Sequence, residues 1–278
     1  MLLFGQRTIG TNSMNDSGEQ SHTSDSGATS RLRLAPDLDP MALQAEFLKG
    51  LRLHVPNVLE NDSADAIYMC LNEQQQWNLA CNVDDRHIDM DATAVEGWTP
   101  EERRKLDTLI YYETGKGIRY TYKTIPIYDM YHNGILPGHF LHRVHEFINS
   151  PEFIGFIRTI SADDSISFSD GMATCFEQGH FLTTHDDDVA TRRAAFVLNL
   201  TPDWHQDWGG ALKFFDEEGN TELALIPTYN ALNIFRIPMC HSVEFVTPLA
   251  KAARLSIVGF LRSGEDPKSR DSPLPDTD

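Results

Sequence analysis

The chain has 278 residues, of which 41% are hydrophobic, and a formal net charge of −18. This length and apolar content suffice for a globular protein with a substantial core, in one large domain or two small ones. The acidic balance argues against a nucleic-acid partner, which requires a basic surface, and is compatible with a basic protein or peptide partner. No apolar run approaches the roughly 20 residues of a membrane span, so no membrane partner is expected.

Cysteine usage indicates the compartment. Cys70, Cys81, Cys175 and Cys240 form no CxxC pair. They lie mostly in apolar surroundings, and we interpret them as reduced core thiols rather than as disulfides or zinc ligands. The apolar start of the chain, residues 1–4, is too short for a signal-peptide core. The sequence therefore predicts a cytoplasmic protein.

The first part of the chain divides into two segments. Residues 1–36 are rich in Ser, Thr, Gly, Asn and Asp, cannot bury enough apolar surface to offset ordering entropy, and are predicted to be disordered. Residues 37–164 are predicted to form a mixed α/β N-terminal half. Its expected helices are 40–48, 63–75, 99–113, 138–150 and 151–161, and its expected extended segments are 51–59, 77–81 and 118–131.

The extended segment 118–131 is unusually rich in tyrosine, with Tyr120, Tyr122, Tyr128 and Tyr131. These side chains could line or cover a substrate groove. The alternative is an ordinary strand, because aromatic residues with a polar tip are common on half-buried strands.

From residue 165 onward the pattern changes to short strands separated by turns. The expected strands are 172–176, 181–185, 194–200, 211–215, 221–226, 231–236, 241–245 and 254–261. About eight closely spaced strands are typical of a double-stranded β-helix, or jelly roll. We therefore predict a mainly β fold with flanking helices, in which residues 165–262 form this core and the N-terminal half packs on it. Residues 263–278 are predicted to be a disordered polar tail.

A pattern of metal-ligand type lies within this predicted core. His185 and Asp187 are two residues apart, and His241 follows downstream. Side chains two apart on a strand share a face, so Asp187 is expected beside His185, whereas Asp186 and Asp188 point away. Two histidines and one carboxylate can cap one face of an octahedral iron and leave three adjacent positions open, as non-haem Fe(II) oxygenases require. We predict that these three residues bind the metal and act in catalysis through it.

Arg254 begins the last expected strand, which is otherwise apolar. A buried guanidinium requires an anionic partner, because an unpaired buried charge is costly. The planar guanidinium matches a carboxylate bidentately. A small dicarboxylate that chelates iron at one end and pairs with Arg254 at the other would satisfy both requirements.

The order of His185, Asp187, His241 and Arg254 resembles the signature of the 2-oxoglutarate- and Fe(II)-dependent oxygenases. The surrounding sequence resembles the prolyl-hydroxylase-type branch, which includes the ribosomal-protein prolyl hydroxylases. The segments that carry this second resemblance are 179–182, 193–200, 204–210 and 227–241. A lone HxD pattern is weak evidence, whereas these elements in one order are specific. The resemblance is dense over residues 165–262 and loose over the hundred or so before them.

The resemblance implies an enzyme that uses Fe(II) as cofactor, 2-oxoglutarate and dioxygen as co-substrates, and ascorbate as a candidate reductant. The implied reaction is oxidative decarboxylation of 2-oxoglutarate, coupled to hydroxylation of a C–H bond. The favoured substrate is a prolyl residue in a protein or peptide. The alternative substrate is free proline or another small molecule.

One position departs from the family pattern. Relatives commonly carry a tyrosine nine residues before the first ligand, where its hydroxyl helps to hold 2-oxoglutarate, and this sequence has Phe176 there. One hydrogen bond to a charged group, worth about 1.5–3 kcal/mol, is then missing or comes from another residue. Asn199 is our candidate for binding the co-substrate in its place. The alternative is that Asn199 is a strand-end residue bonded to backbone.

A second HxD pattern, His87 and Asp89, is interpreted as surface residues that do not bind the metal. It lies in the charged run 84–91, which is expected to be a loop with no apolar strand behind it. His139, His142 and His145 recur at three-residue spacing in an expected helix, and all are expected at the surface.

Two further readings use the same residues. A jelly roll with an iron or 2-oxoglutarate site could be a non-catalytic binding module, which Phe176 would favour and the intact set of ligands disfavours. A zinc hydrolase would use the three ligands but give Arg254 no role, and no metalloprotease-type general base is present in a recognisable motif.

Overall fold

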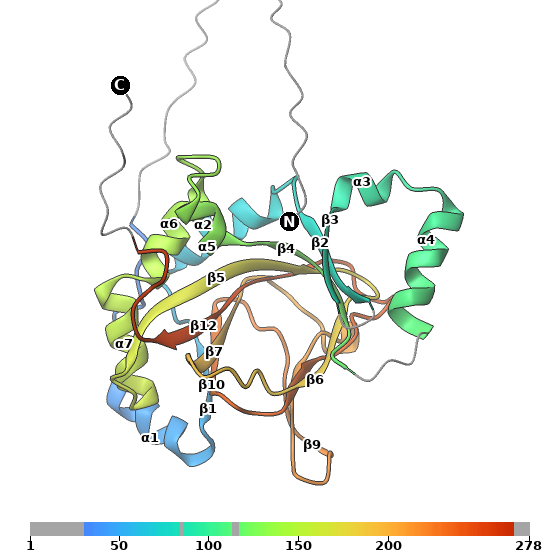
Figure 1. Cartoon of the computed structure of the whole chain (residues 1–278). Helices are drawn as coiled ribbons and strands as arrows, with labels where there is room; N and C mark the ends of the chain where they lie inside the picture. The colour runs from blue at the N-terminus through green and yellow to red at the C-terminus, as the bar shows by residue number, and fades with distance from the viewer. Residues whose placement is uncertain (1–30, 84–85, 113–116, 270–278) are drawn as a thin grey trace, which may run out of the picture. The chain divides into compact units, whose positions relative to one another are not determined.

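The backbone of the described part of the chain is dominated by twelve strands, all of which pair antiparallel. The computed structural model describes residues 31–83, 86–112 and 117–269 (Figure 1). The strands are β1 (Arg52–Pro56), β2 (Asn78–Val83), β3 (Arg86–Asp91), β4 (Tyr120–Ile125), β5 (Ile166–Phe176), β6 (Phe181–His185), β7 (Arg192–Asn199), β8 (Leu212–Phe215), β9 (Thr221–Leu225), β10 (Ala231–Arg236), β11 (His241–Val243) and β12 (Arg254–Ser263). The α-helices are α1 (Pro40–Gly50), α2 (Asn61–Asn72), α3 (Ala92–Glu96), α4 (Pro100–Asp107), α5 (Ile127–His132), α6 (Phe140–Ile148) and α7 (Pro151–Ser161).

The last eight strands form two facing sets. One set has the order β10-β7-β12-β5, and the other has the order β6-β11-β8-β9. Strand β4 pairs with β5 and with β6, so it joins the two sets, and the β2–β3 hairpin extends from its free side. Strand β1 continues the first set beyond β10. This arrangement is the predicted double-stranded β-helix with an N-terminal α/β half packed on it.

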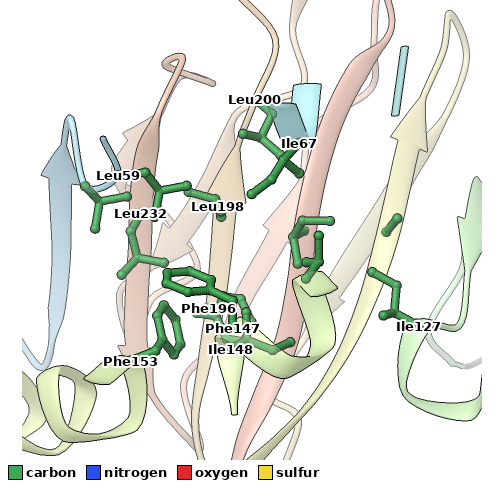
Figure 2. Packing of buried hydrophobic residues seen from close by; sticks show 14 of the residues in the cluster. Leu59, Ile67, Ile127, Phe147, Ile148, Phe153, Phe196, Leu198, Leu200 and Leu232 are labelled. Carbon is green, nitrogen blue, oxygen red and sulfur yellow. The ribbon is translucent and has the colours of Figure 1, made fainter. Parts of the chain in front are cut away.

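The main hydrophobic core lies between the helices and the first set of strands. Figure 2 shows Phe147, Ile148 and Phe153 of α6 and α7 packed against Phe196 and Leu198 of β7. Helix α7 begins where the Ser150 side chain accepts a hydrogen bond from the backbone N–H of Phe153, with proline at its first position, a favourable start for a helix.

Strand β12 separates this core from the interior of the β-helix. Its residues Leu255, Ile257 and Leu261 belong to the main core, whereas Arg254, Val258 and Phe260 line a cavity on the opposite face. Because side chains alternate along a strand, one strand can serve both environments. Packing against the helices therefore fixes the position of β12, whose other face contributes Arg254 to the cavity.

Most expected elements are found within a few residues of their expected bounds, and all eight expected strands of the second half are present. Strand β5 is longer than expected, because it begins at Ile166 rather than at residue 172. The helix start at Thr99 is confirmed by a complete capping box with Glu102, although α4 ends at Asp107 and continues as a π-helical turn, Thr108–Tyr112. The rest of that expected helix, at residue 113, lies outside the described residues.

Three local expectations are wrong. The expected extended segment 118–131 ends at Ile125, and the chain then forms α5, which buries Ile127 and Met130 in the core. Residues 86–91 form strand β3 rather than a loop, because β3 pairs with β2 alone and needs no apolar face of its own. His145 is buried in α6 rather than exposed.

The expected disordered ends and core cysteines also need correction. Leu32 is buried and Leu34 bridges Leu59, so residues 31–36 join the fold. In the expected tail, the Tyr128 hydroxyl donates a hydrogen bond to Asp266. The remaining expected disorder, at residues 1–30 and 270–278, lies outside the described residues. All four cysteines are free, but Cys240 is exposed and only two are buried.

None of the helices within residues 31–83, 86–112 and 117–269 combines the length and the apolar character that crossing a membrane would require.

Close packing of β12 on β5 gives a testable prediction. Gly259 pairs with Gly171, and a Cβ at residue 259 would lie 2.8 Å from the Asp170 carbonyl oxygen and 2.9 Å from the Phe196 ring. Gly259→Ala should therefore lower the free energy of unfolding by about 1–3 kcal/mol, as overpacking does. Urea unfolding measures this change.

Gly155 provides the control. It lies within α7, and a Cβ there would have no heavy atom within 4 Å. Gly155→Ala should raise stability by about 0.5–1 kcal/mol through helix propensity. Equal stability of the two variants would show that β12 and β5 have room to separate.

Candidate metal and co-substrate site

Two paired strands bring the predicted histidines together. His185 is the last residue of β6, His241 is the first residue of β11, and the two lie directly opposite in the antiparallel pairing. Their ring centroids are 4.1 Å apart. The ligand atoms of His185, Asp187 and His241 all lie within 4.8 Å of one another. No other group of His, Cys, Asp and Glu residues in the described parts of the chain has this spacing.

Asp187 reaches this position by a route that differs from the sequence argument. Strand β6 ends at His185, and Asp187 adopts a left-handed backbone conformation with φ of 59°. The expectation that strand alternation places Asp187 beside His185 is therefore wrong, although the carboxylate does lie there. Asp186 and Asp188 are exposed, as expected. Left-handed backbone is strained for a residue with a Cβ and is found mostly where surrounding contacts enforce it.

Backbone carbonyls orient both imidazoles. The Nδ1 of His185 lies 2.9 Å from the Thr183 oxygen, and the Nδ1 of His241 lies 2.8 Å from the Met239 oxygen. A carbonyl can only accept, so each Nδ1 carries the proton and each Nε2 keeps a lone pair. These Nε2 atoms lie 3.5 Å and 3.4 Å from the Asp187 Oδ2. The donor set fits a divalent transition metal.

The electrostatics of the group favour a cation. Burial, reinforced by the neighbouring His185, lowers the pKa of His241 to about 4, so its imidazole is neutral. Burial opposes ionisation of Asp187, but the hydrogen bond and charge of His185, with the charges of His241 and Arg192, lower its pKa overall. Burial also lowers the pKa of His185, and Asp187 outweighs that effect to raise it. The group thus contains a neutral nitrogen donor, His241, and an anionic oxygen donor, Asp187. Its electrostatic environment attracts a positive charge.

Arg254 is a nearly unpartnered buried cation. It is 2% exposed, and its Nη2 donates to the Asn199 Oδ1 at 3.4 Å. Its Nε has no hydrogen-bond partner among the described residues. Its guanidinium carbon lies 5.3 Å from the centre of the Phe176 ring, and burial lowers the pKa of Arg254 to about 10. A charge buried in this way requires an anion, because one neutral amide compensates little of the desolvation cost.

Glycine allows the loop after β7 to approach this cation. Gly209 and Gly210 both have φ of 70°. A Cβ at Gly210 would lie 3.3 Å from the Arg254 Cδ, and one at Gly209 would lie 2.1 Å from the Phe245 carbonyl oxygen. Glycine is thus explained at both positions by positive φ and close packing, of Gly210 against Arg254 and of Gly209 against the Phe245 backbone.

His185, Asp187 and His241, which we call the metal-type group, line the same cavity as Arg254. Its volume is about 400 Å³, and its lining includes His185, Asp187, His241 and Arg254. A volume of this order is typical of small-molecule sites, which are mostly apolar with a few convergent polar groups. The cavity can therefore hold a small anion between a metal and a guanidinium.

Asn199 combines features of both earlier interpretations. It is buried, its Nδ2 lies 3.5 Å from the Ala231 backbone oxygen, and its Oδ1 accepts from Arg254 and from the Ser256 hydroxyl. It is absent from the cavity lining. Asn199 thus contacts the Arg254 guanidinium without lining the cavity, and its role in binding the co-substrate stays a prediction.

Of two further cavity residues, Tyr122 was expected only as part of the tyrosine-rich segment, and Arg192 was not singled out from the sequence. Tyr122 stacks on Phe176 with ring centroids 4.8 Å apart, and burial raises the pKa of its phenol. Arg192 lies beside Asp187. The tyrosine-rich pattern gave a partial signal, since Tyr120 and Tyr122 line the cavity. Tyr128 lies in α5 and is absent from that lining.

The second HxD pattern lies apart from the three predicted metal ligands, although His87 contacts the cavity residue Tyr120. The His87 Nδ1 forms a hydrogen bond of 2.6 Å with the Tyr120 hydroxyl, and its Nε2 lies 3.0 Å from the Asp89 Oδ2 on the exposed β3 strand. Among the residues that the structure describes, neither His87 nor Asp89 belongs to a group with metal-ligand spacing.

Comparisons with known proteins agree with this site. The model of the 2OG-Fe(II) oxygenase superfamily matches residues 171–262. The chain is 32% identical over 116 residues to prolyl 3-hydroxylase OGFOD1 of Mus musculus. The matched segment covers 39% of this chain and 21% of that protein. It is 27% identical over 139 residues to prolyl 3,4-dihydroxylase OGFOD1 of Ostreococcus tauri. Here the matched segment covers 44% of this chain and 26% of that protein. The chain thus spans about a fifth to a quarter of the length of these relatives.

A solved structure supports the fold. The chain superposes with a TM-score of 0.53 on a 2OG-Fe(II) oxygenase family oxidoreductase from Burkholderia pseudomallei, at 11% identity, covering 85% of this chain and 98% of that one. All of the ligand-type residues and Arg254 fall within residues 171–262. Residues 171–262 are thus similar to the 2OG-Fe(II) oxygenase superfamily in the part of the chain that carries the site.

Proposed function

We propose that this chain is a 2-oxoglutarate- and Fe(II)-dependent dioxygenase that hydroxylates a prolyl residue in a protein or peptide. The observation that carries the proposal is the convergence, in one cavity, of three metal-type donors and a buried guanidinium that has no anionic partner among the described residues. A zinc hydrolase would leave the buried charge of Arg254 without a purpose. A chelating dicarboxylate gives both groups a ligand.

In this proposal, His185 and His241 supply two neutral nitrogens and Asp187 supplies one anionic oxygen to Fe(II). Arg254 pairs with the far carboxylate of 2-oxoglutarate, and Asn199 keeps the guanidinium aimed at it. When bound, the metal and the co-substrate supply the oxidising chemistry that uses dioxygen. The protein itself positions the substrate and excludes water.

The relatives suggest the substrate class. Both are named for hydroxylation of prolyl groups, so we assign prolyl residues to this chain and would examine C3 of the ring first. The net charge of −18 favours a basic substrate segment. We further propose ascorbate as reductant, by analogy with the family, and a cytoplasmic location, which the four free cysteines support.

The direct test uses the chain with Fe(II), 2-oxoglutarate, ascorbate and a library of proline-containing basic peptides. Succinate should form in proportion to peptide that gains the mass of one oxygen atom on proline. Proteins from cells with and without the chain should show the same mass difference. Succinate formation that depends on free proline and on no peptide would instead assign a small-molecule substrate, and metal binding without turnover of any substrate would indicate a binding module.

The metal ligands give the first prediction for this site. Asp187→Ala should abolish Fe(II) binding and turnover, because it removes the anionic donor of the group. Asp186→Ala and Asp188→Ala should retain both, since these side chains are exposed. Calorimetric titration under anaerobic conditions measures the metal affinity. Retention of metal by Asp187→Ala with loss in Asp186→Ala would show that the loop after β6 is differently arranged.

Arg254 gives the second prediction. Arg254→Ala would leave the far carboxylate of 2-oxoglutarate unpaired in a buried site, at a cost of about 3–5 kcal/mol of affinity. Iron binding should survive. Arg236→Ala is the matched control, because Arg236 donates to the Ser161 carbonyl oxygen outside the cavity. Co-substrate titration that gives equal affinities for the two variants would assign the carboxylate to another cation.

Asn199 gives the third prediction. Its Oδ1 accepts the hydrogen bond of the Arg254 Nη2, so Asn199→Ala removes the contact that orients the guanidinium. A hydrogen bond to a charged group is worth about 1.5–3 kcal/mol, so 2-oxoglutarate affinity should fall by roughly tenfold or more. Metal affinity should stay the same. An unchanged co-substrate affinity would leave Asn199 as a residue that only joins β7 to β10.

A further inference from the structure

Arg192 is the second guanidinium of the cavity, and a β-bulge places it there. On β7, Ala194 pairs with Leu261 and Arg192 pairs with Arg262, so Arg193 is an extra residue between the two pairs. A bulge re-aims the side chains on either side of it. Arg193 therefore turns outward to Asp163, whereas Arg192 joins the cavity lining.

Arg192 holds the carboxylate of the metal-type group. Its Nη1 lies 3.1 Å from the Asp187 Oδ1 and 3.5 Å from the Asp187 backbone oxygen. The other carboxylate oxygen, Oδ2, faces the Nε2 atoms of His185 and His241. One oxygen of Asp187 is thus engaged by Arg192 and the other is directed to the metal position.

The guanidinium of Arg192 is itself fixed. Its carbon lies 3.5 Å from the centre of the Phe260 ring, which is a close cation–π contact. Arg262 flanks the same ring, and it is held by Asp170 at 2.5 Å and by the Thr191 hydroxyl at 2.8 Å. Phe260 and Arg262, near the end of β12, therefore hold the Arg192 guanidinium in place. Arg192 in turn contacts Asp187 in the loop after β6.

We infer that Arg192 is a positioning residue that makes Asp187 bind the metal through one oxygen only. This inference rests on the proposed function. A carboxylate that is free to rotate can take two metal positions, whereas a 2-oxoglutarate oxygenase needs three adjacent positions for its co-substrate and dioxygen. By engaging Oδ1, Arg192 keeps the third position available and sustains the left-handed backbone of Asp187.

Geometry and charge predict opposite effects for removing Arg192. A positive guanidinium near the metal position repels a cation, so electrostatics alone predicts that its removal strengthens metal binding. Loss of a group that orients a metal ligand typically weakens metal affinity by about 10–100-fold. The sign of the change therefore separates a positioning role from a merely electrostatic one.

The experiment is a titration of the chain with Co(II), whose visible absorption reports the number and arrangement of its ligands. The variants are Arg192→Met, which removes the donor, Arg192→Lys, which keeps a cationic donor, and Arg193→Met as the matched control. We expect Arg192→Met to bind Co(II) about 10–100-fold more weakly than wild type and with an altered spectrum. Arg192→Lys should recover part of the affinity, and Arg193→Met should match wild type in both.

Several outcomes would overturn the inference. Equal or tighter Co(II) binding by Arg192→Met, with an unchanged spectrum, would remove the positioning role and leave the proposed function intact. Weakened binding in Arg193→Met to the same degree would assign the effect to general loosening of β7. If Arg192→Met fails to fold, Phe260→Leu, which removes the surface under the guanidinium, should weaken Co(II) binding, and no change there would count against the role. Failure of the wild-type chain to bind Co(II) would overturn the proposed function as well.

Discussion

The pairing of β6 with β11 is the contact on which the site depends. It places His185 and His241 opposite each other at the point where both strands leave the regular sheet. Because the pairing register is fixed by which face of each strand is buried, a slip of one residue would turn a histidine away. Neither strand is long, and β4 and β8 hold them on their outer sides. The metal geometry is thus a consequence of sheet register.

Strand β12 lies between the hydrophobic core and the cavity that holds the candidate site. One row of its side chains packs against the helices, and the other row faces the cavity from Arg254 at one end to Phe260 near the other. The large apolar core therefore holds two cations in place, Arg254 directly and Arg192 through Phe260. Burying a guanidinium is unfavourable, and a well-packed strand can sustain it where a loop could not.

The loop after β6 shows how local strain accompanies the site. Asp187 has a left-handed backbone, and the residues on either side of it are exposed. Such a conformation persists when surrounding contacts outweigh its cost. The contact that is available here is Arg192, which engages both the carboxylate and the backbone oxygen of Asp187. The arrangement of this loop and that of the bulge in β7 are thus mutually dependent.

The sequence by itself determined the kinds of element and the residues of the metal-type group. The short strands follow from alternating apolar residues, and His185, Asp187, His241 and Arg254 follow from residue types whose burial needs a metal or an anion. These inferences are local, since they depend on the chemistry of a few side chains and on short spacings.

The tertiary structure alone decided what surrounds that group. The sequence argument placed Asp187 by strand alternation, whereas a turn places it. Arg192 rather than Arg193 faces the cavity because of a bulge, and Tyr122 reaches Phe176 because β4 joins the two sets of strands. Bulges, strand order and turns arise from the fit between segments far apart in the chain, and a short sequence pattern carries no record of that fit.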